Sequence, residues 1–122
     1  MIRKRKDKNQ RDIIKALRQI GCKVYDLSNV GEGVPDLLIG CKYLTILAEC
    51  KNKENWYGKK EAHYTTQKTF RETWNGGLVL TFYSPEDALH KITKEIERGI
   101  EAIQKIDMMI QLAERNNKNE KW

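Results

Sequence analysis

Two acids and a lysine, in the segments Pro35-Asp36 and Glu49-Cys50-Lys51, are the residues of this chain best suited to chemistry. Carboxylate oxygens bind hard divalent cations such as magnesium. A bound metal lowers the pKa of its water and polarises a phosphate, and a neighbouring lysine can orient that water and offset charge in the transition state. This combination of residue types therefore suits hydrolysis of a phosphodiester bond.

The pattern around these residues predicts a β-hairpin. Asp36–Gly40 and Leu44–Lys51 are apolar segments of strand length, joined by a tight connection. If Cys41–Leu44 form a four-residue loop, Gly40 pairs with Thr45. The register of the whole hairpin then follows from this one pair.

In that register Asp36 lies opposite Glu49. Directly opposed residues point to the same face of a sheet, about 5 Å apart. Lys51 is two residues beyond Glu49 and shares its face. We therefore expect Asp36 and Glu49 to be metal ligands, with the backbone carbonyl of Cys50 as a further ligand.

A simpler interpretation is that Glu49 and Lys51 form a solvent-facing pair and that Asp36 is a turn residue after a proline. For an isolated acid followed by a short acid-x-lysine motif, this interpretation would be preferred, because so short a pattern arises by chance. The position on a predicted hairpin, with the parity that gives one shared face, favours a functional site.

The elements that must position these residues alternate between helix and strand. Apolar spacing predicts a helix over 9–20 that stops at Gly21, and Ser84 followed by Pro85 is a strong helix start. The expected helices span 9–20, Thr65 or Thr66 to Trp74, and 85–115; the expected strands span 23–27, 36–40, 44–51 and 78–83. This order indicates an α/β fold, with a mixed sheet of about four strands flanked by helices. The helix between the third and fourth strands can serve as a crossover.

The C-terminal helix is longer than a small core needs. Apolar residues recur along it at spacings of three and four; they are Ile92, Ile96, Ile100, Ile103, Ile106, Ile110 and Ala113. We therefore divide the chain into a core of residues 1–92, with a basic arm over 1–8, and a helical extension over 93–122. The extension is expected to pack on a second protomer, giving a homodimer, or to fold back on its own core.

Composition is consistent with one small basic domain. The 122 residues carry a formal net charge of +6 with 39% hydrophobic residues, so a polyanionic partner such as DNA and a merely basic surface are equally compatible with the charge. The three cysteines form no zinc-type cluster and, with no signal sequence at the N-terminus, indicate the cytoplasm. No apolar run reaches membrane-spanning length, so no membrane association is expected.

In order along the chain, three segments resemble the VRR-NUC branch of the PD-(D/E)xK nuclease superfamily. They are Gly31-Glu-Gly-Val-Pro-Asp36-Leu-Leu-Ile-Gly40, Leu47-Ala-Glu49-Cys-Lys51 and Thr65-Thr-Gln67-Lys-Thr-Phe70. The resemblance covers residues 9–92. The VRR-NUC branch includes small stand-alone phage and bacterial proteins. It implies a restriction-endonuclease-like core, Asp36 and Glu49 as metal ligands, Lys51 as the catalytic lysine, and Gln67 as a residue that shapes the active site.

The resemblance implies a magnesium-dependent DNA endonuclease, with manganese able to substitute. Structure-selective cutting is expected, because no separate reading domain is present. The alternatives are a dimeric enzyme like a Holliday-junction resolvase and an inactive DNA-binding protein on a nuclease fold. Related resolvases carry an acid on the first helix; Asp12 and, less well, Asp7 are the candidates here, and Asn9 could substitute.

Basic residues near the expected site are candidates for nucleic-acid contact. Lys53, Lys59 and Lys60 lie with two aromatic residues directly after the catalytic strand, and Arg11 extends the basic N-terminal cluster. A solvated loop and a solubilising tail are the plainer interpretations. Phe70 and Trp74, at helical spacing, are expected in the core. Gly31 and Gly33 allow either a close phosphate approach or a plain turn.

Overall fold

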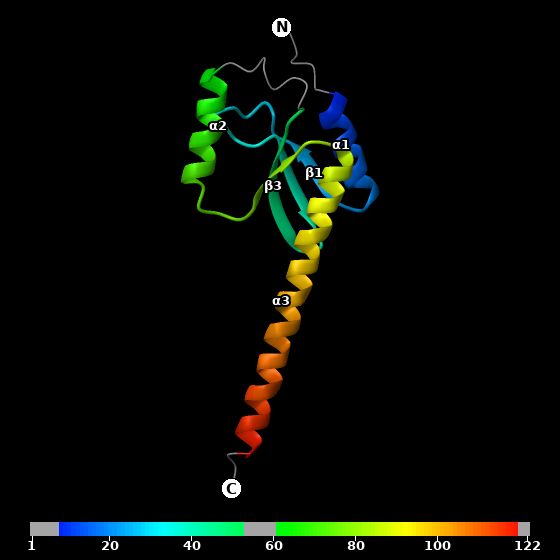
Figure 1. Cartoon of the computed structure of the whole chain (residues 1–122), viewed down its shortest axis with the longest axis vertical. Helices are drawn as coiled ribbons and strands as arrows, with labels where there is room; N and C mark the ends of the chain where they lie inside the picture. Colours follow the sequence, from blue (N-terminus) through cyan, green and yellow to red (C-terminus); the bar gives the residue numbers. More distant parts are fainter. Residues whose placement is uncertain (1–7, 53–60, 120–122) are drawn as a thin grey trace. The chain divides into compact units, whose positions relative to one another are not determined.

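The computed structural model of the protein describes residues 8–52 and 61–119, with the backbone alone for 61–65. The helices are α1 (Lys8–Gln19), α2 (Glu61–Thr73) and α3 (Pro85–Asn119), and the strands are β1 (Lys23–Asp26), β2 (Leu37–Cys41), β3 (Leu44–Cys50) and β4 (Val79–Phe82). The order of elements is the predicted one. The fold is α/β, with a four-stranded mixed sheet flanked by helices and a long C-terminal helix (Figure 1).

The strands lie in the order β1-β2-β3-β4. The first three strands run antiparallel, and β4 pairs parallel to β3. A parallel neighbour requires a crossover connection, and α2 lies in that connection, as predicted. The crossover is what brings α2, from a distant part of the sequence, to the sheet beside β3.

The β2–β3 hairpin has the predicted register, since Gly40 pairs with Thr45. The turn is shorter than the expected four-residue loop, because Cys41 and Leu44 also pair. Only Lys42 and Tyr43 form the connection, and both have positive φ, at 49° and 70°. Two-residue hairpins favour this geometry because its twist matches that of the strands.

The first helix ends as the sequence predicts. Gly21 has a φ of 96°, and its N–H donates to the carbonyl of Arg18 at 3.1 Å. The N–H of Cys22 donates to the carbonyl of Leu17 at 3.1 Å. These two bonds form a Schellman motif, which satisfies carbonyls at the end of the helix.

The start of α2 differs from the prediction. A cap at Thr65 or Thr66 was expected, but the helix already begins at Glu61. Glutamate and alanine at the first two positions are good helix formers, so the helix extends back past both threonines. Of the loop expected over 52–63, residues 61–63 belong to the helix, and residues 53–60 lie outside the described part of the chain.

The third helix starts as predicted. Ser84 is the N-cap: its hydroxyl accepts from the N–H of Asp87 at 3.0 Å, and its carbonyl accepts from the N–H of Ala88. Pro85 takes the first helical position, and acids follow in the first turn. The helix continues to Asn119, four residues beyond the expected end at Arg115.

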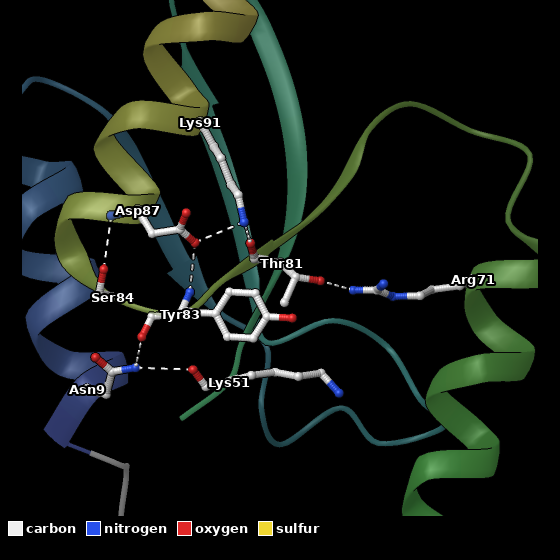
Figure 2. A network of polar contacts seen from close by, with 8 residues as sticks. All are labelled: Asn9, Lys51, Arg71, Thr81, Tyr83, Ser84, Asp87 and Lys91. Atoms are coloured by element: carbon white, nitrogen blue, oxygen red, sulfur yellow. Dashed lines mark hydrogen bonds and ion pairs between the residues drawn. The ribbon is translucent and has the colours of Figure 1, made fainter. Parts of the chain in front are cut away.

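The described residues fall into two compact units that divide between Lys91 and Ile92. In the first unit, α1 and the beginning of α3 lie on one side of the sheet and α2 on the other (Figures 1 and 2). The first unit's core is apolar, and its fully buried side chains include Ile13, Leu17, Leu37, Ile39, Ile46 and Phe82. The second unit is helical. Within the described ranges, every helix is too short or too polar to cross a membrane.

Candidate active site

Glu49 is the buried acid of the site. It lies near the end of β3 with 1% of its surface exposed. Its Oε1 has no hydrogen-bond partner among the described residues, while its Oε2 lies 3.8 Å from Lys51 Nζ. A carboxylate removed from water in this way requires compensating charge. The simpler interpretation, in which Glu49 is a solvent-facing strand residue, is therefore wrong.

Lys51 follows the end of β3 and points to the same side of the sheet as Glu49. Its Nζ donates to Gln67 Oε1 at 3.3 Å. Gln67 is itself buried and projects from the middle of α2. The helix thereby fixes the position of the lysine amine, and the three predicted residues Glu49, Lys51 and Gln67 come together.

Asp36 lies directly before β2, one residue beyond the last pair of the β2–β3 ladder, which joins Leu37 to Ala48. The next position in that register is opposite Glu49, as predicted. Asp36 Oδ2 accepts a hydrogen bond from the N–H of Cys50 at 2.8 Å. This bond attaches the half-buried carboxylate to the same strand end that carries Glu49 and Lys51.

A second cation at the site, Arg71, was missed by the sequence reasoning. Its guanidinium donates to Glu49 Oε2 at 3.2 Å and to the hydroxyl of Thr81, which pairs with Glu49 across β3 and β4. Arg71 is four residues after Gln67 on α2, so both side chains share one helical face. That spacing is the signal that could have predicted it.

The ends of β3 and β4 are connected by Asn9, near the start of α1. Its side-chain amide donates to the carbonyl of Tyr83 at 3.0 Å and to that of Lys51 at 3.4 Å (Figure 2). Asn9 thus contacts the backbone beside the site. Asp12, the predicted first-helix acid, instead forms a surface ion pair with Lys8 at 3.4 Å, and Asp7 lies outside the described residues.

On the far side of Tyr83, the start of α3 completes the polar network (Figure 2). Asp87 Oδ2 accepts from the N–H of Tyr83 at 3.0 Å and from Lys91 Nζ at 2.9 Å. Burial raises the pKa of Asp87, but the hydrogen bonds from Lys91 and Tyr83 outweigh burial and lower it overall. Lys91 also donates to the carbonyl of Thr81. Thr81 of β4 is therefore contacted by Lys91 from α3 and by Arg71 from α2.

The donors at this site fit a hard cation. Asp36 and Glu49 supply oxygens, the ligand atoms that magnesium prefers. The Oε1 of Glu49, which has no hydrogen-bond partner among the described residues, is a buried acceptor that could bind a cation. Within the described residues no three His, Cys, Asp or Glu side chains gather to hold a metal. A magnesium ion here would thus rely on water for much of its shell, as it commonly does.

A basic stripe runs along α1. Arg11, predicted to contact nucleic acid, is exposed, and it lines a shallow surface groove together with Lys15 and Arg18. The spacing of four and then three residues places the three cations on one helical face, and this could have identified Lys15 and Arg18 from the sequence. The other predicted contacts, Lys53, Lys59 and Lys60, lie outside the described residues.

The three cysteines all lie in the first unit. Cys22, Cys41 and Cys50 are buried free thiols. Burial, together with the neighbouring Cys41, raises the pKa of Cys22 to about 12. A thiol that stays protonated at neutral pH is a poor nucleophile, so Cys22 is a structural residue.

Two other sequence interpretations are changed by the structure. Trp74, expected in the core, is 43% exposed; it stacks on the half-buried Phe70 with ring centroids 5.2 Å apart, and its indole N–H donates to the carbonyl of Gly77. Gly33 has a φ of 76°, and a Cβ there would overlap the backbone carbonyl of Thr66. The loop that contains Gly31 and Gly33, called the glycine loop below, therefore packs closely against α2 beside Gln67.

Comparison of the chain with family models, with curated proteins and with solved structures gave no match.

Proposed function

We propose that this protein is a metal-dependent nuclease that hydrolyses phosphodiester bonds in DNA, with its active site at the end of the β2–β3 hairpin. The observation that carries the proposal is the buried Glu49 carboxylate. One of its oxygens faces two cations, from Lys51 and Arg71, and the other has no partner among the described residues. Such a residue costs stability to bury, and a binding or catalytic role accounts for that cost.

Asp36 and Glu49 are the residues that would hold magnesium, with manganese as a substitute. When bound, the metal would supply an activated water and polarise the phosphate. In hydrolysis the water oxygen forms a bond to phosphorus, the bond from phosphorus to the leaving sugar oxygen breaks, and that oxygen takes up a proton. Lys51, whose amine donates a hydrogen bond to Gln67, would orient the water and offset negative charge on the phosphate.

The partner in this proposal is DNA, gripped through its phosphates. The exposed Arg11 and its neighbours on α1 supply cations that contact a backbone without selecting a sequence. Recognition of DNA shape, ends or single strands therefore fits better than sequence-specific cutting. The free thiols of the three cysteines fit a reducing compartment such as the cytoplasm.

A nuclease assay tests the proposal. Labelled duplex, single-stranded, flap and four-way-junction DNA would be incubated with magnesium, manganese or EDTA. We expect metal-dependent cutting that falls on the order of 100-fold or more in Asp36→Asn, Glu49→Gln and Lys51→Ala, because each variant removes a charge from the site. Asp12→Asn, which changes an exposed carboxylate on α1, serves as the matched control and should cut normally.

Calorimetric titration with manganese gives an independent result. Glu49→Gln should lose most of the heat of manganese binding, whereas Asp12→Asn should retain it. DNA binding without cutting in any metal would contradict the enzymatic proposal and favour a binding protein on this fold. Cutting that survives all three site substitutions would place the active site elsewhere in the chain.

A further inference from the structure

The second unit exposes an unusual amount of apolar surface. From Ile92 onward it is the remainder of one continuous helix, α3. Seven large apolar side chains on it are at least half exposed: Ile100, Ile103, Ile106, Met108, Met109, Ile110 and Leu112. An apolar surface of this length marks an interaction site when its residues share one face.

Most of these residues do share a face, and its spacing is that of a coiled coil. Positions at alternating steps of three and four form a seam consisting of Ile96, Gly99, Ile103, Ile106, Ile110 and Ala113. Ile100, Ala102 and Met109 flank the seam, whereas Met108 and Leu112 lie outside it. A repeat averaging 3.5 residues keeps one face toward a partner helix along its whole length.

We propose that this seam binds the same seam of a second copy of the chain, with the two helices antiparallel. The proposal concerns the second unit alone and does not depend on the nuclease function. It commits to one arrangement, in which Ile103 of each copy packs against Ile106 of the other. Moving outward from that centre, each Gly99 meets an Ile110 and each Ile96 meets an Ala113.

The sizes of the seam residues favour this direction over the parallel one. In the antiparallel pairing every small residue faces a large one, so the layers have similar volumes. In a parallel pair Gly99 would face Gly99 and Ala113 would face Ala113, next to layers with two isoleucines. Such layers leave voids, and voids in a packed interface are destabilising.

The flanking positions agree with the antiparallel direction. On one side of the seam Ala102 faces Met109 of the other copy. On the other side Ile100 lies next to Asp107, and Glu114 lies next to Thr93. None of these flanking pairs brings two like charges together. Like charges across the interface would oppose association.

The exposed area is large enough for a dimer. Fully burying an aliphatic side chain contributes about 1.5 to 3 kcal/mol. At about 25 cal/mol per Å², this corresponds to about 60 to 120 Å² of apolar surface. The half-exposed or more exposed side chains of the seam and its flanks are Ile100, Ile103, Ile106, Met109 and Ile110. Together with the half-buried Ile96 and with Ala102 and Ala113, they give about 1,000 Å² over both copies, which is about the lower limit for a specific interface.

The first test is the mass of the full chain in solution, measured by sedimentation equilibrium over a range reaching high micromolar concentration. We expect a dimer that Ile106→Glu converts to a monomer. Met108→Glu is the matched control: it places the same charge on the same helix, at a residue 63% exposed against 57% for Ile106, but outside the seam. It should remain dimeric, and circular dichroism should show both variants folded.

The second test is disulfide crosslinking, which determines the direction. Ile103→Cys and Ile106→Cys proteins would be oxidised separately and as a mixture, with the unaltered chain as a control for its three buried thiols. The antiparallel pair predicts a covalent dimer only in the mixture. A monomer at every concentration, a dimer insensitive to Ile106→Glu, or crosslinking of each single variant alone would each overturn the proposal.

Discussion

The two faces of the β-sheet differ in what they bury. The face toward α1 is apolar, and its residues Leu37, Ile39, Ile46, Ala48 and Phe82 have no exposed surface. The face toward α2 carries Glu49 near the end of the same central strand, with Lys51 beyond it and Thr81 opposite. Because strand residues alternate between faces, neighbours in the sequence lie in different surroundings, and one sheet separates an apolar core from the charged side chains of the candidate site.

This comparison shows why the site can bury a carboxylate. A fully packed apolar face stabilises the sheet, so the opposite face can carry an acid whose burial is unfavourable. Substitutions on the two faces should therefore differ in kind. Those on the α1 face should lower the free energy of unfolding, whereas those on the α2 face should act mainly on cation binding and catalysis.

The largest expected effect on stability is that of Phe82→Ala. Phe82 is fully buried at the end of β4, so its truncation should lower the free energy of unfolding by about 3 to 5 kcal/mol. Thr81→Ala, one residue earlier and on the other face, should cost about 1 kcal/mol through the lost hydrogen bond with Arg71. Urea unfolding measures both, and equal losses would contradict the assignment of the two faces.

A smaller effect is expected where the glycine loop meets α2. Gly33→Ala forces a positive φ on alanine and creates an overlap with the Thr66 carbonyl. Gly31→Ala has a similar φ of 78° and open space around the added Cβ, so it should cost only about 1 to 2 kcal/mol. Thermal unfolding should show Gly33→Ala as clearly the worse of the pair, and indistinguishable variants would show that the contact with α2 is unimportant.

The next effect depends on pH. The pKa of Asp87 is lowered in the folded protein from its ordinary 3.8, so the folded state binds this proton less tightly than the unfolded chain does. Its contribution is therefore fully present above the unfolded pKa and is lost as pH falls through the folded pKa. Asp87→Asn should cost about 1 kcal/mol at neutral pH, as the loss of an acid in the first helical turn does, and should flatten the fall in stability on acidification.

Urea unfolding of both proteins from neutral pH to below pH 3.8 measures that difference. The two curves should converge at the acid end, because there the wild-type carboxyl is also neutral. Curves that stay parallel across the whole range would show that the contribution of Asp87 does not depend on its charge.

The smallest effect on stability is expected for Arg71→Gln. Arg71 is 41% exposed, and an ion pair with so exposed a partner contributes about 0 to 1 kcal/mol. Its removal should nevertheless tighten manganese binding several-fold in calorimetry, because one positive charge leaves Glu49. The prediction rests on the proposed metal site, and weaker binding would show instead that Arg71 is needed to hold Glu49 in position.

How far the sequence predicted this site depends on how local each signal is. The register that brings Asp36 opposite Glu49 follows from one hairpin turn and a two-residue period, so it could be counted along the chain. The loop was nevertheless set two residues too long, because Lys42 and Tyr43 adopt positive φ without a glycine. The register was unaffected, since lengthening the loop symmetrically preserves every pair.

Contacts between distant elements were not predictable in the same way. Arg71 reaches Glu49 only because the crossover brings α2 to the sheet, and Asn9 connects strand ends that follow it by more than 40 residues. The sequence placed Trp74 in the core from its type and spacing, but the ring stacks on Phe70 near the surface. The type of a residue limits which contacts its side chain can make, and the segments that the fold brings next to it determine which contacts it does make.

The sequence by itself determined the elements, the hairpin register and the chemical character of Asp36, Glu49 and Lys51, because periodicity, caps and turns act over a few residues. Only the tertiary structure decided that Glu49 is buried and that Arg71 faces it. Burial and charge pairing arise between segments far apart in the chain, and their energies depend on the distance and solvent exposure that the fold imposes.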